Sequence, residues 1–251
     1  MKKVAFLFSG GINHIANYPR YRNNLGFARK VLMEKYGYAM ENIYVMYANG
    51  QPFTYMGERI SSIPAYKEEF YRLIEKFSKD LSPQDQFLFL TSNHGDYGEE
   101  ALLNLWEEEF YTLSDIRDML NMISCKKACI FGHCFGGYFK DCCSRNTIFI
   151  SACSKNQKSH SCYPQQEYDE FLYHLLSYLN GAYPDGTVIV NESRELEKAF
   201  DFAFAHDMWN PACEQHVELL EMLGQDAANI KDRIEEPIFL NCLDESENFC
   251  L

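Results

Sequence analysis

The sequence contains no long hydrophobic run. A membrane-spanning helix needs about 20 consecutive apolar residues, and no stretch of the chain approaches that length. An apolar run at Val4–Phe8 follows two lysines, but it is shorter than the roughly 7–15 residues of a signal-peptide core. We therefore interpret residues 3–8 as a strand and predict a cytoplasmic protein that is not associated with a membrane.

Basic residues are scarce relative to acidic ones. The chain has 23 Lys and Arg against 36 Asp and Glu, a formal net charge of −13. Non-specific nucleic-acid binding depends on Lys and Arg that neutralise phosphates, so this balance argues against nucleic acid as a partner. Hydrophobic residues make up 47% of the 251 residues, enough for a substantial core. We expect a single domain over residues 1–251, with a core at 3–180 and with C-terminal helices and an edge strand at 181–251.

The most cysteine-rich region of the chain lacks pairs of cysteines at the spacing of a metal site. That region contains His133, Cys134, Cys142, Cys143, Cys153 and Cys162. No pair in it has the C-x₂₋₄-C spacing of a zinc site, and Cys125 and Cys129, which have such a spacing, are not followed by a second pair. Ten cysteines scattered in this way indicate reduced thiols. We predict no metal and no cofactor, with a zinc site as an alternative.

The chain does contain a regular alternation of short apolar runs and amphipathic segments. The expected strands are 3–8, 42–47, 86–91, 127–131, 147–152 and an edge strand at 237–240. The expected helices are 22–36, 63–79, 112–122, 168–179, 192–207 and 214–223. This alternation, with strands so apolar, predicts an α/β fold with a mostly parallel sheet of about six strands and helices on both faces.

Two of these strands end close to residues whose side chains can take part in catalysis. The strand at 86–91 leads to His94 and Gly95, and the strand at 127–131 leads to Cys134 on a glycine-rich turn. Sites in parallel sheets lie beyond the C-terminal strand ends, so we expect both side chains at one edge. An imidazole can take the proton of a nearby thiol, and the backbone N–H groups of Gly95 and Cys134 can bind an oxyanion. The pair predicts a cysteine hydrolase.

These residues resemble the caspase-like cysteine peptidases, the group of caspases, legumain, gingipain and separase. Its members carry one strand that ends in His-Gly and a later strand that ends in cysteine. The resemblance is greatest to legumain-type members, because residues 9–11 and 17–22 look like the segment after their first strand. Residues 148–153 and 158–163 are similar to their pocket-forming strand and loop. The resemblance implies a caspase-like α/β/α sandwich that hydrolyses peptide bonds in a protein or peptide substrate.

The resemblance also implies individual roles. Cys134 would be the nucleophile, His94 the general acid and base, and Gly95 an oxyanion donor. Arg22 would line the specificity pocket, and Ser151 and Ser159 would belong to the opposite wall.

One position departs from the group, and it bears on specificity. Caspases and legumain have Gln or Glu two residues before the cysteine, where this chain has Gly132. The preference for the residue before the cleaved bond, P1, is therefore not carried over. An arginine in the pocket favours Asp or Asn by charge-assisted hydrogen bonds, whereas Asp96, Asp169 or Glu170 there would favour Arg or Lys. Our expectation is Asp or Asn.

Two other interpretations of the same residues stay open. Residues 132–136 fit the Gly-x-nucleophile-x-Gly elbow of an α/β-hydrolase that acts on esters or lactones. That fold needs an acid and a histidine after the nucleophile, and the candidates are Asp169 and Asp185 with His174, His206 and His216. The second interpretation is a catalytically idle caspase-like scaffold that binds partners. A homodimer through the 237–240 strand, or a regulatory partner, is compatible with a peptidase and with a scaffold. Trp106 in the acidic stretch 99–109 is expected to pack beneath its loop rather than to be exposed.

Overall fold

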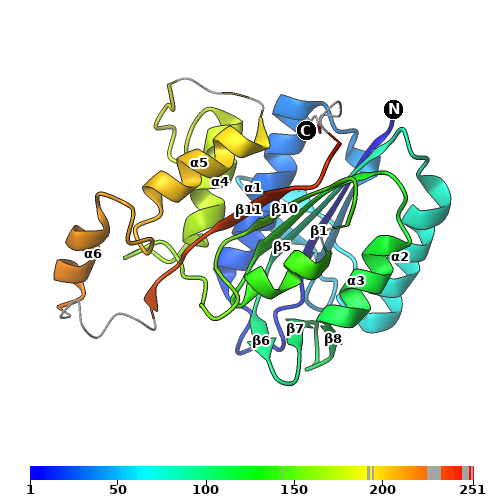
Figure 1. Ribbon diagram of the computed structural model, residues 1–251, viewed down its shortest axis with the longest axis horizontal. Helices are drawn as coiled ribbons and strands as arrows, with labels where there is room; N and C mark the ends of the chain where they lie inside the picture. Colours follow the sequence, from blue (N-terminus) through cyan, green and yellow to red (C-terminus); the bar gives the residue numbers. More distant parts are fainter. Residues whose placement is uncertain (143, 191–192, 194, 225–232, 245–248, 250) are drawn as a thin grey trace.

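The computed structural model describes residues 1–142, 144–190, 193, 195–224, 233–244, 249 and 251. A six-stranded sheet in the order β11-β10-β9-β5-β1-β2 lies at its centre (Figure 1). Its strands are β1 (Lys3–Ser9), β2 (Ile43–Tyr47), β5 (Gln86–Ser92), β9 (Lys126–Gly132), β10 (Thr147–Ser151) and β11 (Ile238–Asn241). The first five are parallel, and β11 pairs antiparallel with β10 as an edge strand. The predicted fold class is confirmed.

Helices cover both faces of this sheet (Figure 1). On one face lie α1 (Pro19–Tyr36) and α4 (Glu170–Asn180), with α5 (Leu196–His206) beside α4. On the other face lie α2 (Lys67–Asp80) and α3 (Leu113–Asn121). The short helix α6 (His216–Met222) lies at the end of the molecule farthest from α2. The first residue of the helix expected at 192–207 is Glu192, which lies outside the described residues.

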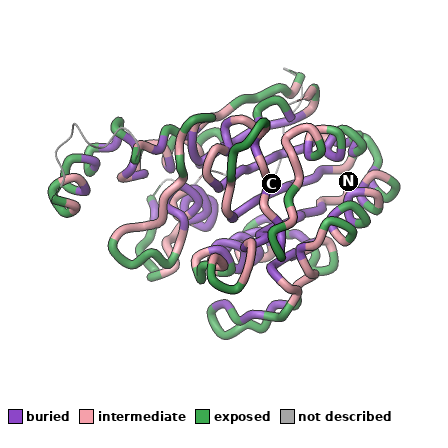
Figure 2. The backbone as a smooth tube through the Cα atoms, turned by 90° about the horizontal axis from the view of Figure 1, so that it is seen from below, coloured by how far each residue is buried: buried purple, intermediate pink, exposed green. Residues whose placement is uncertain are grey.

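The two faces of the sheet bury different kinds of side chain, because successive residues of a strand point to opposite sides. Toward α2 the layer is aromatic: the ring of Phe6 lies 5.0 Å from that of Phe70 and 5.8 Å from that of Phe77. Toward α1 and α4 the layer is aliphatic, with Leu90 and Ile130 among its residues. Figure 2 shows the resulting buried centre and the exposed outer helix faces. Strands buried on both sides explain why their sequences are nearly all apolar.

The boundaries of two helices differ from the prediction for identifiable reasons. Helix α2 begins at Lys67, not at residue 63, because Ile63 continues the sheet: its N–H donates to Val45 O and its carbonyl accepts from Tyr47 N–H. Helix α1 begins three residues earlier than predicted, with Pro19 in its first turn. Proline is favoured there since that position needs no N–H donor.

The acidic stretch 99–109 contains one strand of a small sheet, and its acidic residues lie in the connections on either side of that strand. Strands β6 (Gly95–Tyr97), β7 (Ala101–Asn104) and β8 (Phe110–Thr112) form this antiparallel sheet. Strands β3 (Phe53–Tyr55) and β4 (Glu58–Ile60) form a separate hairpin. Trp106 is only 3% exposed, which confirms that it is a packing residue. Because β6 follows His94 directly, the small sheet is anchored at the same edge as the candidate residues.

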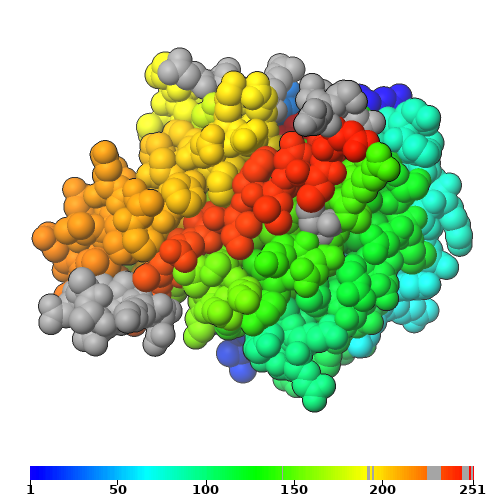
Figure 3. All heavy atoms as spheres, viewed as in Figure 1, coloured from blue at the N-terminus to red at the C-terminus, as the bar shows by residue number. Residues whose placement is uncertain are grey.

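The C-terminal segment returns to the central sheet. In Figure 3 it runs diagonally across the visible surface, shown in red, between α5 and the part of the chain that contains α3. Among the described residues, no helix is both long and apolar enough to cross a bilayer.

Candidate active site

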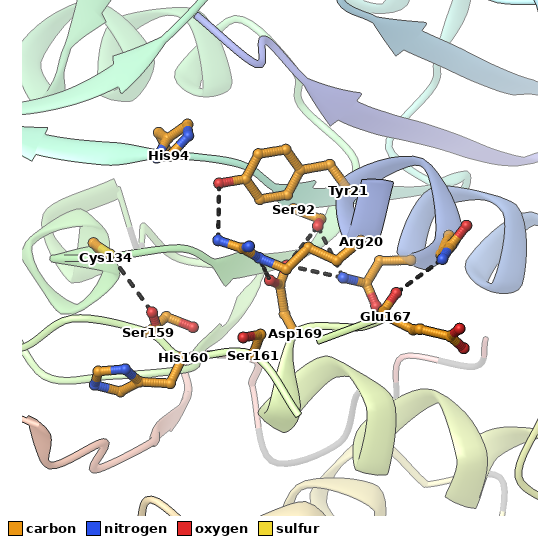
Figure 4. Close-up of polar contacts among 12 residues, drawn as sticks. Arg20, Tyr21, Ser92, His94, Cys134, Ser159, His160, Ser161, Glu167 and Asp169 are labelled. Atoms are coloured by element: carbon orange, nitrogen blue, oxygen red, sulfur yellow. Dashed lines mark hydrogen bonds and ion pairs between the residues drawn. The ribbon is translucent and has the colours of Figure 1, made fainter. Parts of the chain in front are cut away.

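The register of β5 and β9 puts His94 and Cys134 just beyond the ends of two neighbouring strands. Ser92 pairs with Gly132 in the parallel ladder, and each candidate residue follows two positions later. The approach is tight, because a β-carbon at Gly95 would overlap the carbonyl oxygen of Cys134 and lie 2.5 Å from His133 Nδ1. Figure 4 shows the imidazole and the thiol at this edge of the sheet.

Cys134 lies on a tight turn that is fixed from several sides. The Gly136 N–H donates to His133 O at 3.1 Å, and the Phe135 N–H donates to Gln157 O at 2.8 Å. Phe135 has a φ of 60°, an uncommon left-handed conformation for a bulky residue. His133 is buried, and its Nδ1 lies 2.9 Å from Cys134 O. Since a carbonyl oxygen can only accept a hydrogen bond, His133 Nδ1 carries the proton. It donates to Cys134 O and so stabilises the turn.

The Cys134 thiol is protonated in the resting state. Its Sγ donates a long hydrogen bond of 3.7 Å to Ser159 O. Burial raises the pKa of Cys134, and the carboxylate of Asp169 adds to the rise, whereas the Ser159 contact, Lys158 and Arg20 oppose it. A thiol of this kind needs a base to become a nucleophile.

His94, beyond the end of the neighbouring strand, is held by backbone and aromatic contacts. Its Nε2 lies 2.8 Å from Ala16 O, so Nε2 carries the proton and Nδ1 keeps its lone pair. The ring also packs against Tyr18 and Tyr21, with centroids 5.2 Å apart in each case. Burial lowers the pKa of His94, although the hydrogen bond to Ala16 opposes this shift. The imidazole is therefore neutral at physiological pH and can accept the thiol proton.

An ion pair between the partly buried Arg20 and the buried Asp169, which the sequence analysis did not identify, lies beside these two residues. Arg20 Nε donates to Asp169 Oδ1 at 2.8 Å (Figure 4). Asp169 Oδ2 also accepts from Asn24 Nδ2 at 2.8 Å and from Ser92 Oγ at 2.6 Å. The guanidinium carbon of Arg20 lies 4.2 Å from the ring centroid of Tyr18. Asp169 is thus saturated with donors, and Arg20 is held in place by its neighbours.

The structure places Arg22, the arginine expected from the sequence, elsewhere. Arg22 is exposed and lines a different cavity together with Tyr47 and Trp106. The cause is the start of helix α1 at Pro19, because residues two apart on a helix point about 200° away from each other. Of the two arginines, Arg20 therefore faces the cysteine.

The other expected pocket residues have different environments. Ser159 contributes its carbonyl to the Cys134 thiol, and its hydroxyl donates to the buried Glu235 at 3.0 Å. Ser151 is fully buried below the cysteine turn, where its hydroxyl donates to Cys153 O at 2.7 Å. Asp96 is exposed on β6, and its charge raises the pKa of His94, against the net shift. Of these three, Ser159 alone makes a hydrogen bond with the cysteine among the described residues.

Gly132 has a packing explanation. A β-carbon there would overlap Leu172 Cδ1 of α4 and lie 2.7 Å from Thr91 O. A side chain longer than that of glycine therefore has no space at this position. We expect Gly132→Ala to lower the free energy of unfolding by about 1–3 kcal/mol in urea denaturation, the usual cost of overpacking. Gly98→Ala is the control, because nothing lies within 4 Å of a β-carbon at that position. Equal stability of the two variants would contradict this account.

The histidines required by an α/β-hydrolase are engaged elsewhere. His174 lies 3.2 Å from Glu170 and 3.0 Å from the Tyr183 hydroxyl. His206 is bonded to Phe202 O at 2.8 Å, and His216 to Met208 O at 2.7 Å. Within the described part of the chain, which excludes Cys143, no group of three or more His, Cys, Asp or Glu could hold a metal ion.

The architecture is that of a caspase-like α/β/α sandwich. Among solved structures, caspase-1 from Spodoptera frugiperda matches with a TM-score of 0.56 and 13% identity, over 96% of this chain and 87% of that one. Protein GSU0716 from Geobacter sulfurreducens matches with a TM-score of 0.58 and 12% identity, over 96% and 93% of the two chains. No family model and no curated protein matches the sequence. At such identities the likeness concerns the fold.

Proposed function

We propose that this chain is a cysteine endopeptidase in which Cys134 is the nucleophile and His94 the general acid and base. The observation that carries the proposal is the pairing of Ser92 with Gly132, which sets both residues just beyond neighbouring strand ends. The overlap that any side chain at Gly95 would make with Cys134 supports the same arrangement.

The proposed reaction follows from the protonation states. His94 Nδ1 takes the proton from Cys134 Sγ as the sulfur attacks the peptide carbonyl. The N–H groups of Gly95 and Cys134 stabilise the oxyanion. The imidazolium then gives its proton to the leaving amine, a thioester forms, and water activated by His94 hydrolyses it. This sequence requires no cofactor.

The proposed P1 preference is Asp or Asn, with Arg20 as the recognising residue. Only one edge of its guanidinium is bonded to Asp169, through Nε, and its Nη2 makes a longer contact of 3.4 Å with the Tyr21 hydroxyl. The remaining donors suit a carboxylate or an amide oxygen. We also propose that the protein is legumain-like and located in the cytoplasm, and that its substrate is a protein or a peptide. The α/β-hydrolase is less favoured because the fold is caspase-like. The idle scaffold is less favoured because the chain carries both His94 and Cys134.

A set of fluorogenic peptides that differ only at P1, combined with an acyloxymethyl ketone carrying the same sequence, tests the proposal. We expect cleavage after Asp or Asn at least about tenfold faster than after Lys, Leu or Ser. Mass spectrometry of the labelled protein should locate the ketone on Cys134 and not on Cys242, an exposed thiol. Hydrolysis of simple esters without peptide cleavage, or labelling at another cysteine, would contradict the peptidase assignment.

A further inference from the structure

A cavity of about 700 Å³, separate from the one that Arg22 lines, opens next to the segment that follows Ser159. Neither Cys134 nor His94 lines it. Its walls come from residues 162–174, the turn at 183–185 and residues 206–215, together with Met56. The volume is in the range of sites that hold small organic molecules. Nothing in the proposed reaction uses this cavity.

One wall of the cavity is a continuous aromatic surface. The rings of Tyr168 and Tyr173 lie 5.2 Å apart, and those of Tyr173 and Tyr183 lie 5.0 Å apart. Tyr163 also lines the cavity. The faces of aromatic rings attract cations, and several rings around one space strengthen this attraction.

The charged groups of the cavity have one sign. Glu170 is only 3% exposed, while Glu167 and Asp185 lie at the exposed rim. None of the described lining residues is Lys or Arg. His174 lies between Glu170 and the Tyr183 hydroxyl, at 3.2 Å and 3.0 Å.

The Glu170 carboxylate affects the pKa of a neighbouring carboxyl group, that of Asp207. Asp207 is fully buried, and burial followed by the Glu170 carboxylate raises its pKa well above the ordinary value. A negative potential that acts on a neighbouring acid also acts on a ligand in the cavity. It favours cations and disfavours anions there.

We propose that this cavity binds an organic cation, with a guanidinium or ammonium group against Glu170 and the tyrosine rings and an apolar stem along the wall. Two sources share this chemistry: a free small amine, and a basic side chain of a bound peptide. Ser159, which contacts Cys134, is three residues from Cys162 of the cavity, at most about 10 Å along the chain. A peptide residue a few positions before the cleaved bond is therefore within reach. This peptide source alone rests on the proposed function.

Calorimetric titration with butylguanidine, and with the neutral butylurea of nearly the same shape, tests the cavity. We expect saturable binding of butylguanidine, and affinity for butylurea that is weaker by about tenfold or more. Glu170→Gln and the rim variant Asp185→Asn should both weaken butylguanidine binding, while Glu197→Gln, an exposed carboxylate on α5, should not. If Glu170→Gln does not fold, the affinity of Asp185→Asn for butylguanidine is the test. Equal affinity for the two probes, or no effect of either cavity variant, would overturn the proposal.

A peptide series distinguishes the two sources. Each upstream position of a cleaved peptide carries Arg or its neutral isostere citrulline in turn. A preference for Arg at one position that disappears in Asp185→Asn supports a basic side chain as the occupant. No preference at any position, together with butylguanidine binding, supports a free amine. If the protein cleaves no peptide, the proposed function fails, but the titration still decides whether the cavity binds cations.

Discussion

Alanine at Cys134 is expected to abolish peptide cleavage, and alanine at His94 to lower kcat/KM by about 10²–10⁴. The first change removes the atom that forms the thioester. The second leaves a buried thiol whose pKa is raised by its surroundings, with no base to deprotonate it. Steady-state kinetics with the preferred peptide measure both effects. Because the two residues act as one unit, the double variant should be little worse than Cys134→Ala alone.

Two matched substitutions separate this expectation from loss of folding and from the hydrolase alternative. Cys242→Ser removes an exposed thiol and should leave kcat/KM unchanged. His216→Ala removes a histidine that lies on α6 and is bonded to Met208 O. Loss of turnover in His216→Ala with retention in His94→Ala would favour a downstream base and would overturn the proposed pair. Near-ultraviolet circular dichroism checks that each variant is folded.

The catalytic part of the candidate site could be predicted because it depends on strand ends. The apolar runs that become β5 and β9 are recognisable in the sequence, and parallel pairing puts their C-terminal ends at one edge. The positions of His94 and Cys134 beyond these strand ends therefore follow without any knowledge of loop structure. The edge strand β11 was also predictable, since its apolar run is short and follows a proline.

The specificity side of the site could not be predicted because it depends on side-chain direction and on distant contacts. An error of three residues in the start of α1 changes which of Arg20 and Arg22 lies beside Asp169. Asp169 reaches this region only because α4 packs beside α1, a tertiary contact with no local signal. The small sheet β6–β8 was missed because its charged residues resemble a solvated loop.

Replacing Arg20 by methionine is expected to destabilise the protein by about 3–5 kcal/mol, because it leaves the carboxylate of Asp169 buried without a cation. Burial already raises the pKa of Asp169, and Arg20 opposes this rise. Without Arg20 the pKa rises further. The folded protein must then either hold an unpaired charge or take up a proton at neutral pH. The cost grows as the pH rises above 3.8, the ordinary pKa of this carboxyl, because the unfolded state then loses a proton that the folded variant holds. The loss of stability should therefore be larger at pH 7.5 than at pH 4.5. Urea denaturation at the two pH values measures it.

The same variant tests the P1 assignment, and its neighbour provides the comparison. Arg20→Met should lower kcat/KM for peptides with Asp at P1 by about 100-fold, and for Asn peptides by less, because a neutral amide gains less from a cation. Asp169→Asn keeps the shape and the Arg20 contact, so it should retain the Asp preference and lose the dependence of stability on the titration of this carboxyl. Arg22→Met should change stability by less than about 0.5 kcal/mol, as expected for an exposed side chain. If Arg22→Met removes the Asp preference while Arg20→Met preserves it, the original sequence-based choice of arginine is right, and the proposed role of Arg20 is wrong.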